Sequence, residues 1–167
     1  TRFDKSVRAG NFYSIGGSWI VSSEDFLANL SSIDLLKLRV SYGELGNNNL
    51  KDKYFPYLRL FETGYNQLDN PGVILGDLTD PYLTWEKTAS FNVGLDFSLF
   101  NNRLEGSIDY YKKRSIDLLF AIPQAPSTGN LELLSNAGTI ENYGLEVSLT
   151  THLLRTKDWK WDTSLNF

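Results

Sequence analysis

The sequence predicts an all-β protein, built as an antiparallel up-and-down meander of about six strands. Two long segments, 85–99 and 104–117, alternate apolar and polar side chains and are joined by the polar pair Asn101-Asn102. Successive side chains of a strand point to opposite faces, so each segment has one apolar and one polar face. Asparagine tolerates the left-handed backbone angles of a tight turn, which predicts that the two segments form a hairpin.

The first pair of strands is expected at 12–21 and 35–43, where the same alternation occurs. Residues 1–10 are polar and charged, and we expect them to form a loop. Between the two strands, Ser22-Ser23 precedes two acidic residues and a short apolar stripe. This order is typical of a helix N-terminus and predicts one or two helical turns within 22–34.

The last pair of strands is expected at 139–151 and 159–167, with a short turn between them. Two much longer connections, 44–84 and 118–138, contain Gly, Pro and Asn clusters that interrupt regular structure. We therefore expect both to be irregular loops.

Connection lengths alternate along the chain, and this favours part of a transmembrane β-barrel over an ordinary soluble sheet. Outer-membrane barrels have short periplasmic turns and long extracellular loops. The short connections 22–34, 100–103 and 152–158 would then be periplasmic. Aromatic residues near strand ends would form the girdle of such a barrel; those residues are Tyr42, Trp85, Phe100, Trp159 and Trp161.

The alternation also predicts which side chains face lipid and which face the barrel interior. The apolar set comprises Phe91, Val93, Leu95, Phe97, Ile108, Tyr110, Leu145, Val147 and Leu149. The polar set comprises Asn92, Asp96, Glu105, Asp109, Glu146 and Ser148. The alternative is a soluble β-sandwich, such as a carbohydrate-binding module, which would bury the apolar set between two stacked sheets.

Composition excludes several other classes. The chain has 16 Lys+Arg and 20 Asp+Glu, a net charge of -4 that argues against a nucleic-acid partner. It has no cysteine, hence no disulfide framework and no thiolate metal site. No apolar run approaches the roughly 18 residues of a membrane-spanning helix. The chain opens at Thr1 and ends within an alternating segment, so we expect a fragment of a longer protein.

Several stretches resemble one family, the SusC/RagA-type TonB-dependent transporters. Leu36 to Asn47 resembles their LKLRxSYGxxGN stretch, and Trp85 to Asp96 is similar to their WExT…NxGLD strand. Asn102 to Tyr111 resembles NRLxGSxDYY, and Asn136 to Glu146 resembles NAGxxxNxGxE. Trp159 to Phe167 resembles WxWxxxxNF. These matches follow one another in order over nearly the whole chain.

The resemblance implies that residues 1–167 are part of the barrel of an outer-membrane transporter, whose plug and TonB box lie outside this chain. The parent barrel would have roughly 22 strands and a plugged lumen. It would import a glycan, a peptide or a similar nutrient in a Bacteroidetes-type bacterium. Its partners would be TonB, a SusD-like surface lipoprotein and outer-membrane lipid. Neither an enzyme activity nor a cofactor is implied.

Candidate binding residues come from the aromatic loop at 44–84, because loops on a rigid scaffold are free to carry recognition. The candidates for substrate or partner binding are Tyr54, Tyr57, Phe61 and Tyr65. Rings and nearby amides suit sugar stacking or a protein lid, although the same rings could simply pack the loop onto the barrel rim.

Neither a catalytic nor a metal site is predicted. His152 is the single histidine, and we expect it to be a solvated turn residue. Asp69, Asp77 and Asp80 could offer oxygen ligands to Ca²⁺, but they match no EF-hand spacing, and turn chemistry explains them equally well.

Overall fold

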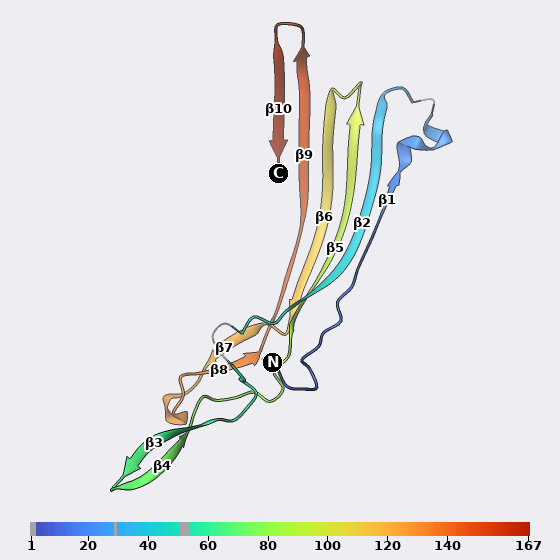
Figure 1. Cartoon of the computed structure of the whole chain (residues 1–167). Coiled ribbons are helices and arrows are strands. Elements are labelled where there is room, and N and C mark those ends of the chain that lie inside the picture. The colour runs from blue at the N-terminus through green and yellow to red at the C-terminus, as the bar shows by residue number, and fades with distance from the viewer. Residues whose placement is uncertain (1–2, 29, 51–53) are drawn as a thin grey trace. The chain divides into compact units, whose positions relative to one another are not determined.

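The computed structural model describes residues 3–28, 30–50 and 54–167 and confirms the all-β meander. Its main sheet has the strand order β1-β2-β5-β6-β9-β10, so neighbours in the sheet follow one another along the chain (Figure 1). The strands are β1 (Ser14–Ile20), β2 (Ile33–Asn47), β5 (Glu86–Leu99), β6 (Leu104–Ile116), β9 (Thr139–Arg155) and β10 (Lys160–Asn166).

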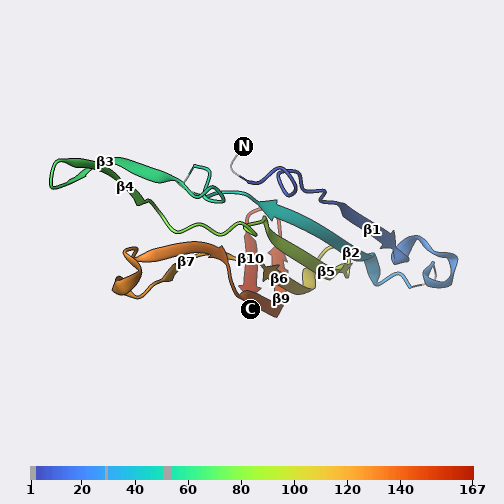
Figure 2. The same ribbon diagram turned by 90° about the horizontal axis from the view of Figure 1, so that it is seen from below.

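The three predicted hairpins are all present. β1 pairs antiparallel with β2, from Ser14 opposite Gly43 to Ile20 opposite Lys37. β10 pairs antiparallel with β9, with a bulge at Trp161/Asp162. β5 and β6 are joined through Asn101 and Asn102, both with φ 57°. Left-handed angles at both asparagines confirm the tight turn. Figure 2 shows β1, β2 and β5 following one another in the sheet.

The chain divides into two compact units, which we describe separately. The sheet unit comprises 13–44, 89–114 and 141–167, and the loop unit comprises 1–12, 45–88 and 115–140. β2, β5, β6 and β9 begin in one unit and end in the other.

The long connections are not irregular, and the sequence prediction was wrong on this point. The first contains a hairpin of β3 (Phe61–Gln67) and β4 (Asn70–Leu75); the second contains a hairpin of β7 (Leu119–Pro123) and β8 (Glu132–Asn136). The turn of the first hairpin is Leu68-Asp69, with φ 50° and 63°. Asn70, Pro71 and Gly72, one of the Gly, Pro and Asn clusters expected to interrupt regular structure, lie in β4 instead. Leucine rarely adopts a left-handed conformation, so a leucine at position 68 does not indicate a turn.

The segment after β1 forms two single 3₁₀ turns, η1 (Val21–Ser23) and η2 (Asp25–Leu27), so the expected helical turns are present. Neither has a side-chain cap, so the predicted serine cap is wrong. Trp19 Nε1 instead donates to Glu24 Oε1 at 2.8 Å. One further 3₁₀ turn, η3, spans Pro126–Thr128. Within the described residues, no helix has the length and apolarity to cross a membrane.

Contacts on the polar face confirm the predicted side-chain alternation. Arg39 on β2 binds Asp96 on β5 through two hydrogen bonds of 2.7 and 2.8 Å, and Asp109 on β6 through one of 2.9 Å. Asn92 donates to Ser41 at 3.4 Å. A planar guanidinium suits such multiple contacts with carboxylates. This ionic cluster of Arg39, Asp96 and Asp109 connects three consecutive strands on one face.

A glycine makes room for the ionic cluster. A Cβ added to Gly94 would lie 2.2 Å from Asp109 Oδ1 and 2.8 Å from Arg39 Nη2. A second glycine on the same face, Gly144, lies under the ring of Tyr111, whose hydroxyl oxygen would be 2.8 Å from an added Cβ. Both positions leave space for a large side chain from a neighbouring strand.

The opposite face is apolar and exposed. Ile15 is 71% exposed, Leu145 61% and Leu165 49%. A β-sandwich would bury this face against a second sheet. The exposed apolar face therefore contradicts the soluble β-sandwich alternative and fits a surface that faces lipid.

One of the predicted girdle residues has a different role. Trp85 packs in the loop unit, where its ring stacks on Phe3 at 5.8 Å between centroids and its Nε1 donates to Val7 O at 2.9 Å. The prediction was wrong for Trp85 because these partners come from the first ten residues, far away in sequence. Trp159 and Trp161 are 75% and 59% exposed, as a girdle requires.

We predict that Gly94→Ala destabilises the folded sheet by roughly 1–3 kcal/mol, because the new methyl group displaces the ionic cluster. The measurement is the unfolding temperature of the full-length protein. Gly17→Ala is the matched control, since an added Cβ there meets nothing within 4 Å. Equal melting of the two variants would contradict this role for Gly94.

Candidate functional site

The loop unit has a small core of its own, which holds the two long connections together. Phe3, Leu50 and Leu83 are its buried residues, at 2%, 2% and 0% exposure. The partly buried residues around them are Val7, Trp85, Leu119 and Leu134. Both connections therefore contribute to one packed structure, and not to separate free loops.

Asn136, at the end of β8 in the second long connection, forms hydrogen bonds with Thr84 in the first. Its Oδ1 accepts from Thr84 N at 2.6 Å, and its Nδ2 donates to Thr84 O at 3.0 Å and to Asp117 O at 2.7 Å. The side-chain amide thus pairs with both backbone groups of Thr84, as another strand would. Ser135 Oγ also donates to Asp80 Oδ2.

The β3–β4 hairpin carries part of the candidate site. Its register shifts between Thr63 and Tyr65, and Gly64 at the shift has φ 97°. Tyr65 donates from its hydroxyl to Glu62 Oε2 at 2.9 Å. This carboxylate raises the pKa of Tyr65 above its ordinary value, because it stabilises the protonated phenol.

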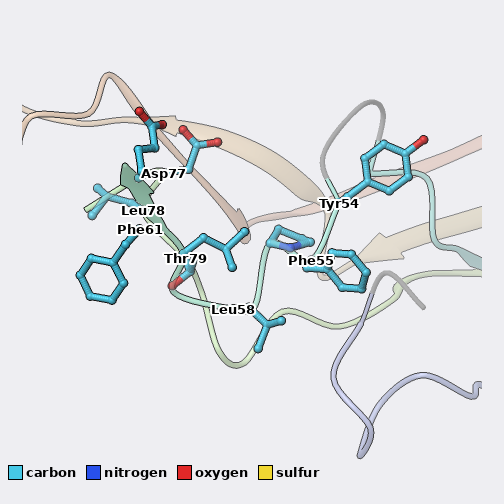
Figure 3. A pocket seen from close by; sticks show the side chains of 11 residues that line it. Tyr54, Phe55, Leu58, Phe61, Asp77, Leu78 and Thr79 are labelled. Carbon is cyan, nitrogen blue, oxygen red and sulfur yellow. The ribbon is translucent and has the colours of Figure 1, made fainter. Parts of the chain in front are cut away.

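A cavity of about 350 Å³ lies beside the start of β3 and the end of β4 (Figure 3). Among the described residues, its walls are mainly aromatic and aliphatic and include two carboxylates, those of Glu62 and Asp77. The lining residues are Tyr54, Phe55, Pro56, Leu58, Leu60, Phe61, Glu62, Gly76, Asp77, Leu78 and Thr79. Such a mixture binds apolar groups by contact and can orient a polar or cationic group through the carboxylates.

The structure separates the four predicted binding residues. Tyr54 and Phe61 line the cavity and are 67% and 62% exposed. Tyr57 instead contacts Phe55 edge-on, with ring centroids 6.5 Å apart. Tyr65 lies further along β3 and outside the lining.

Sequence reasoning missed most of the cavity walls. Leu58 and Leu60 alternate with a charged residue, a signal that could have extended the apolar strand pattern upstream of β3. Phe55 has φ 56°, a conformation rare for a phenylalanine, and nothing in the sequence indicates it.

The acidic loop residues have structural roles. Asp69 forms the hairpin turn at φ 63°. Asp80 bonds Ser135 and also accepts from Tyr82 N at 2.9 Å through Oδ1. In the part of the chain that the structure describes, no group of three His, Asp or Glu side chains is arranged to hold a metal ion.

His152 is not a solvated turn residue, and that prediction was wrong. It lies within β9, its side chain is 12% exposed, and its Nδ1 lies 2.6 Å from Asp162 Oδ1 on β10. Its Nε2 lies 3.9 Å from Glu105 Oε1 on β6. β9 extends to Arg155, four residues beyond the predicted end at 151, so this histidine joins the polar face of the sheet. Its partners are cross-strand neighbours, which sequence spacing cannot reveal.

A meander with one exposed apolar face, a polar opposite face and long structured connections defines a segment of an outer-membrane β-barrel. Comparison with known protein families identifies the family of this barrel. Residues 1–167 match the family described as TonB dependent receptor-like, beta-barrel, and the chain belongs to this family. The family is one of receptors, which places the chain outside the enzymes and in the outer membrane.

Curated relatives confirm the resemblance to SusC/RagA-type proteins. The chain is 38% identical over its whole length to TonB-dependent receptor P39 of Formosa agariphila. It is 36% identical over 99% of its length to TonB-dependent receptor SusC of Bacteroides thetaiotaomicron. It spans only 16% and 17% of these relatives.

Solved structures show the same similarity. The chain matches a chain in the structure of the RagAB peptide transporter with a TM-score of 0.84 and 30% identity. It matches the RagAB peptide importer in its closed-closed state with a TM-score of 0.85. In both cases, 99% of this chain and 18% of the other are covered.

We predict that Asn136→Ala loosens the loop unit, because Thr84 N and O lose their partners. The expected cost is about 2 kcal/mol, given that unpaired backbone groups cost about 1–3 kcal/mol. Hydrogen exchange at the Thr84 amide of the full-length receptor should accelerate by roughly tenfold or more.

The control is Asn130→Ala, which removes one long side-chain contact of 3.4 Å to Gly76 O. Unchanged exchange at Thr84 in the Asn136 variant would contradict the fastening role.

Proposed function

We propose that this chain forms part of the wall and of the extracellular rim of a TonB-dependent transporter that imports nutrients such as glycans or peptides. The observation that carries the proposal is the match of the whole chain to the receptor barrel family, together with a sheet whose apolar face is exposed. In this proposal the apolar face contacts lipid and the polar face lines the lumen.

Orientation follows from the connections. The hairpin turns at 100–103 and between β9 and β10 are short, whereas the connections of the loop unit are long and structured. Barrels of the outer membrane keep short turns on the periplasmic side, so we assign the loop unit to the extracellular side. There it would meet incoming substrate and a SusD-like lipoprotein, while TonB would supply energy from the periplasm through parts outside this chain.

The cavity beside the β3–β4 hairpin supports a recognition role for the loop unit. Tyr54 and Phe61 present exposed rings, a form of apolar surface that stacks on sugars or packs against peptide side chains. The name of the RagAB structure refers to peptide, which supports a peptide as one candidate substrate class. Two pockets on the sheet, one beside Arg39 and one beside Glu105, are lined mainly by glycine and polar residues instead.

The test uses the full-length receptor with its lipoprotein partner. Tyr54→Ala and Phe61→Ala should each weaken binding of the transported substrate by roughly tenfold, equal to about 1.4 kcal/mol. Substrate affinity should be measured by calorimetry with peptide and oligosaccharide pools, and uptake should be measured in cells.

Tyr82→Ala is the matched control, because Tyr82 is 88% exposed in the same connection but does not line the cavity. Tyr57→Ala and Tyr65→Ala should have smaller effects than the cavity variants. Unchanged affinity in the Tyr54 and Phe61 variants would remove the cavity as a recognition site, and absence of uptake by the wild-type receptor would refute import.

A further inference from the structure

Charged side chains interrupt the apolar face of the sheet near one end of β6. Lys112 on β6 and Glu141 on β9 form an ion pair of 3.1 Å, so both lie on the same face. Alternate residues of a strand share a face, so Arg114, Tyr110 and Ile108 lie on the same apolar face as Lys112. Tyr110 and Ile108 precede Lys112 along β6, and Arg114 follows it. Charges on a lipid-facing surface are tolerated only near the membrane interface.

Side-chain chemistry changes in layers along both strands. On β6 the order is Ile108, Tyr110, Lys112, Arg114, and on β9 it is Leu145, Tyr143, Glu141. Tyr143 and Tyr110 are 69% and 40% exposed. Tyrosine rings are enriched where hydrocarbon meets headgroups. The residues that follow the tyrosines are therefore at headgroup level.

Strand geometry agrees with this assignment. Residues two apart along a strand are separated by roughly 7 Å, which gives about 5 Å along the membrane normal at a tilt of about 45°. Lys112 is thus about 5 Å beyond Tyr110, and Arg114 about 9 Å beyond it. The headgroup region of each leaflet is about 5–8 Å thick, so Lys112 lies within it and Arg114 at its outer edge.

The charge of this patch is positive. Lys112 and Arg114 are opposed by one carboxylate, that of Glu141, which leaves one excess positive charge. The side chain of Lys112 is 47% exposed, and its ammonium has three donors, so the ion pair does not exhaust it. Arg114 is exposed and presents a guanidinium, which binds phosphate through paired hydrogen bonds.

We propose that Lys112 and Arg114 form a binding site for phosphate-bearing lipid headgroups of the outer leaflet, with Tyr110 and Tyr143 packing against the adjoining part of the lipid. This inference rests on the extracellular assignment of the long connections proposed above. Glu141 pairs with Lys112 at 3.1 Å, and the phosphate contacts the remaining donors of both cations.

The test uses the purified full-length receptor and two probes, lipid A and dephosphorylated lipid A with the same acyl chains. Bound lipid per receptor is measured after gel filtration in detergent. The wild-type receptor should retain several-fold more lipid A than the dephosphorylated form, and added salt should reduce the difference. Equal retention of both probes by the wild-type receptor overturns the proposal and requires no variant.

Variants then locate the site. Lys112→Gln and Arg114→Gln should each lower lipid A retention by roughly fivefold, since one basic residue near an anionic surface has an effect of this size. Lys113→Gln is the matched control: it removes the same charge from the adjacent position, which faces the other side of the sheet. Lys112→Arg should retain lipid A.

Retention that is unchanged in the two Gln variants, or equally reduced in the Lys113 control, would overturn the site. Substrate uptake by cells with the Gln variants should match that of the wild type. Failure of the lipid site is thus distinguishable from failure of the transport proposal, in which the wild-type receptor itself shows no uptake.

Discussion

The structure depends on a sheet that is apolar on one face and polar on the other, with the apolar face left uncovered. Ile15, Leu145 and Leu165 expose large parts of their surface, a condition that water would penalise and a lipid phase would not. The buried core of the described residues is correspondingly small and lies in the loop unit, around Phe3, Leu50 and Leu83. Stability of the sheet must therefore come from strand pairing, from polar contacts on the other face and from the surrounding lipid.

Residues that carry the family resemblance make many of those polar and close contacts. Arg39 of the first motif binds Asp96 of the second and Asp109 of the third. Gly94 lies beneath this cluster, and Gly46 lies against the ring of Phe12. Asn136, in the fourth motif, fastens the loop connections. These residues explain how the barrel wall is held, whereas the cavity that could select a substrate is lined by residues 54–79, outside the motifs.

The strands, the three hairpins and the two faces could be predicted from the sequence, because alternation and the Asn101-Asn102 turn are local signals. The hairpin in the first long connection could not, because Leu68 in its turn adopts a left-handed angle that its side chain does not favour. The same holds for Phe55 in the cavity wall. The contact of His152 with Glu105 and that of Trp85 with Val7 were also inaccessible, since these partners are distant in sequence. Of the four residues that the sequence suggested for the candidate site, Tyr54 and Phe61 line the cavity, and Tyr57 and Tyr65 do not.

The central claim is that the apolar face contacts lipid and the polar face does not. Its most direct test places a spin label at each position from 91 to 97 of the full-length receptor in bilayers; this chain contributes no competing cysteine. Collision with oxygen, which concentrates in lipid, should peak at Phe91, Val93, Leu95 and Phe97 and fall at the residues between them. A profile without this two-residue period, or with its peaks at Asn92 and Asp96, would contradict the account.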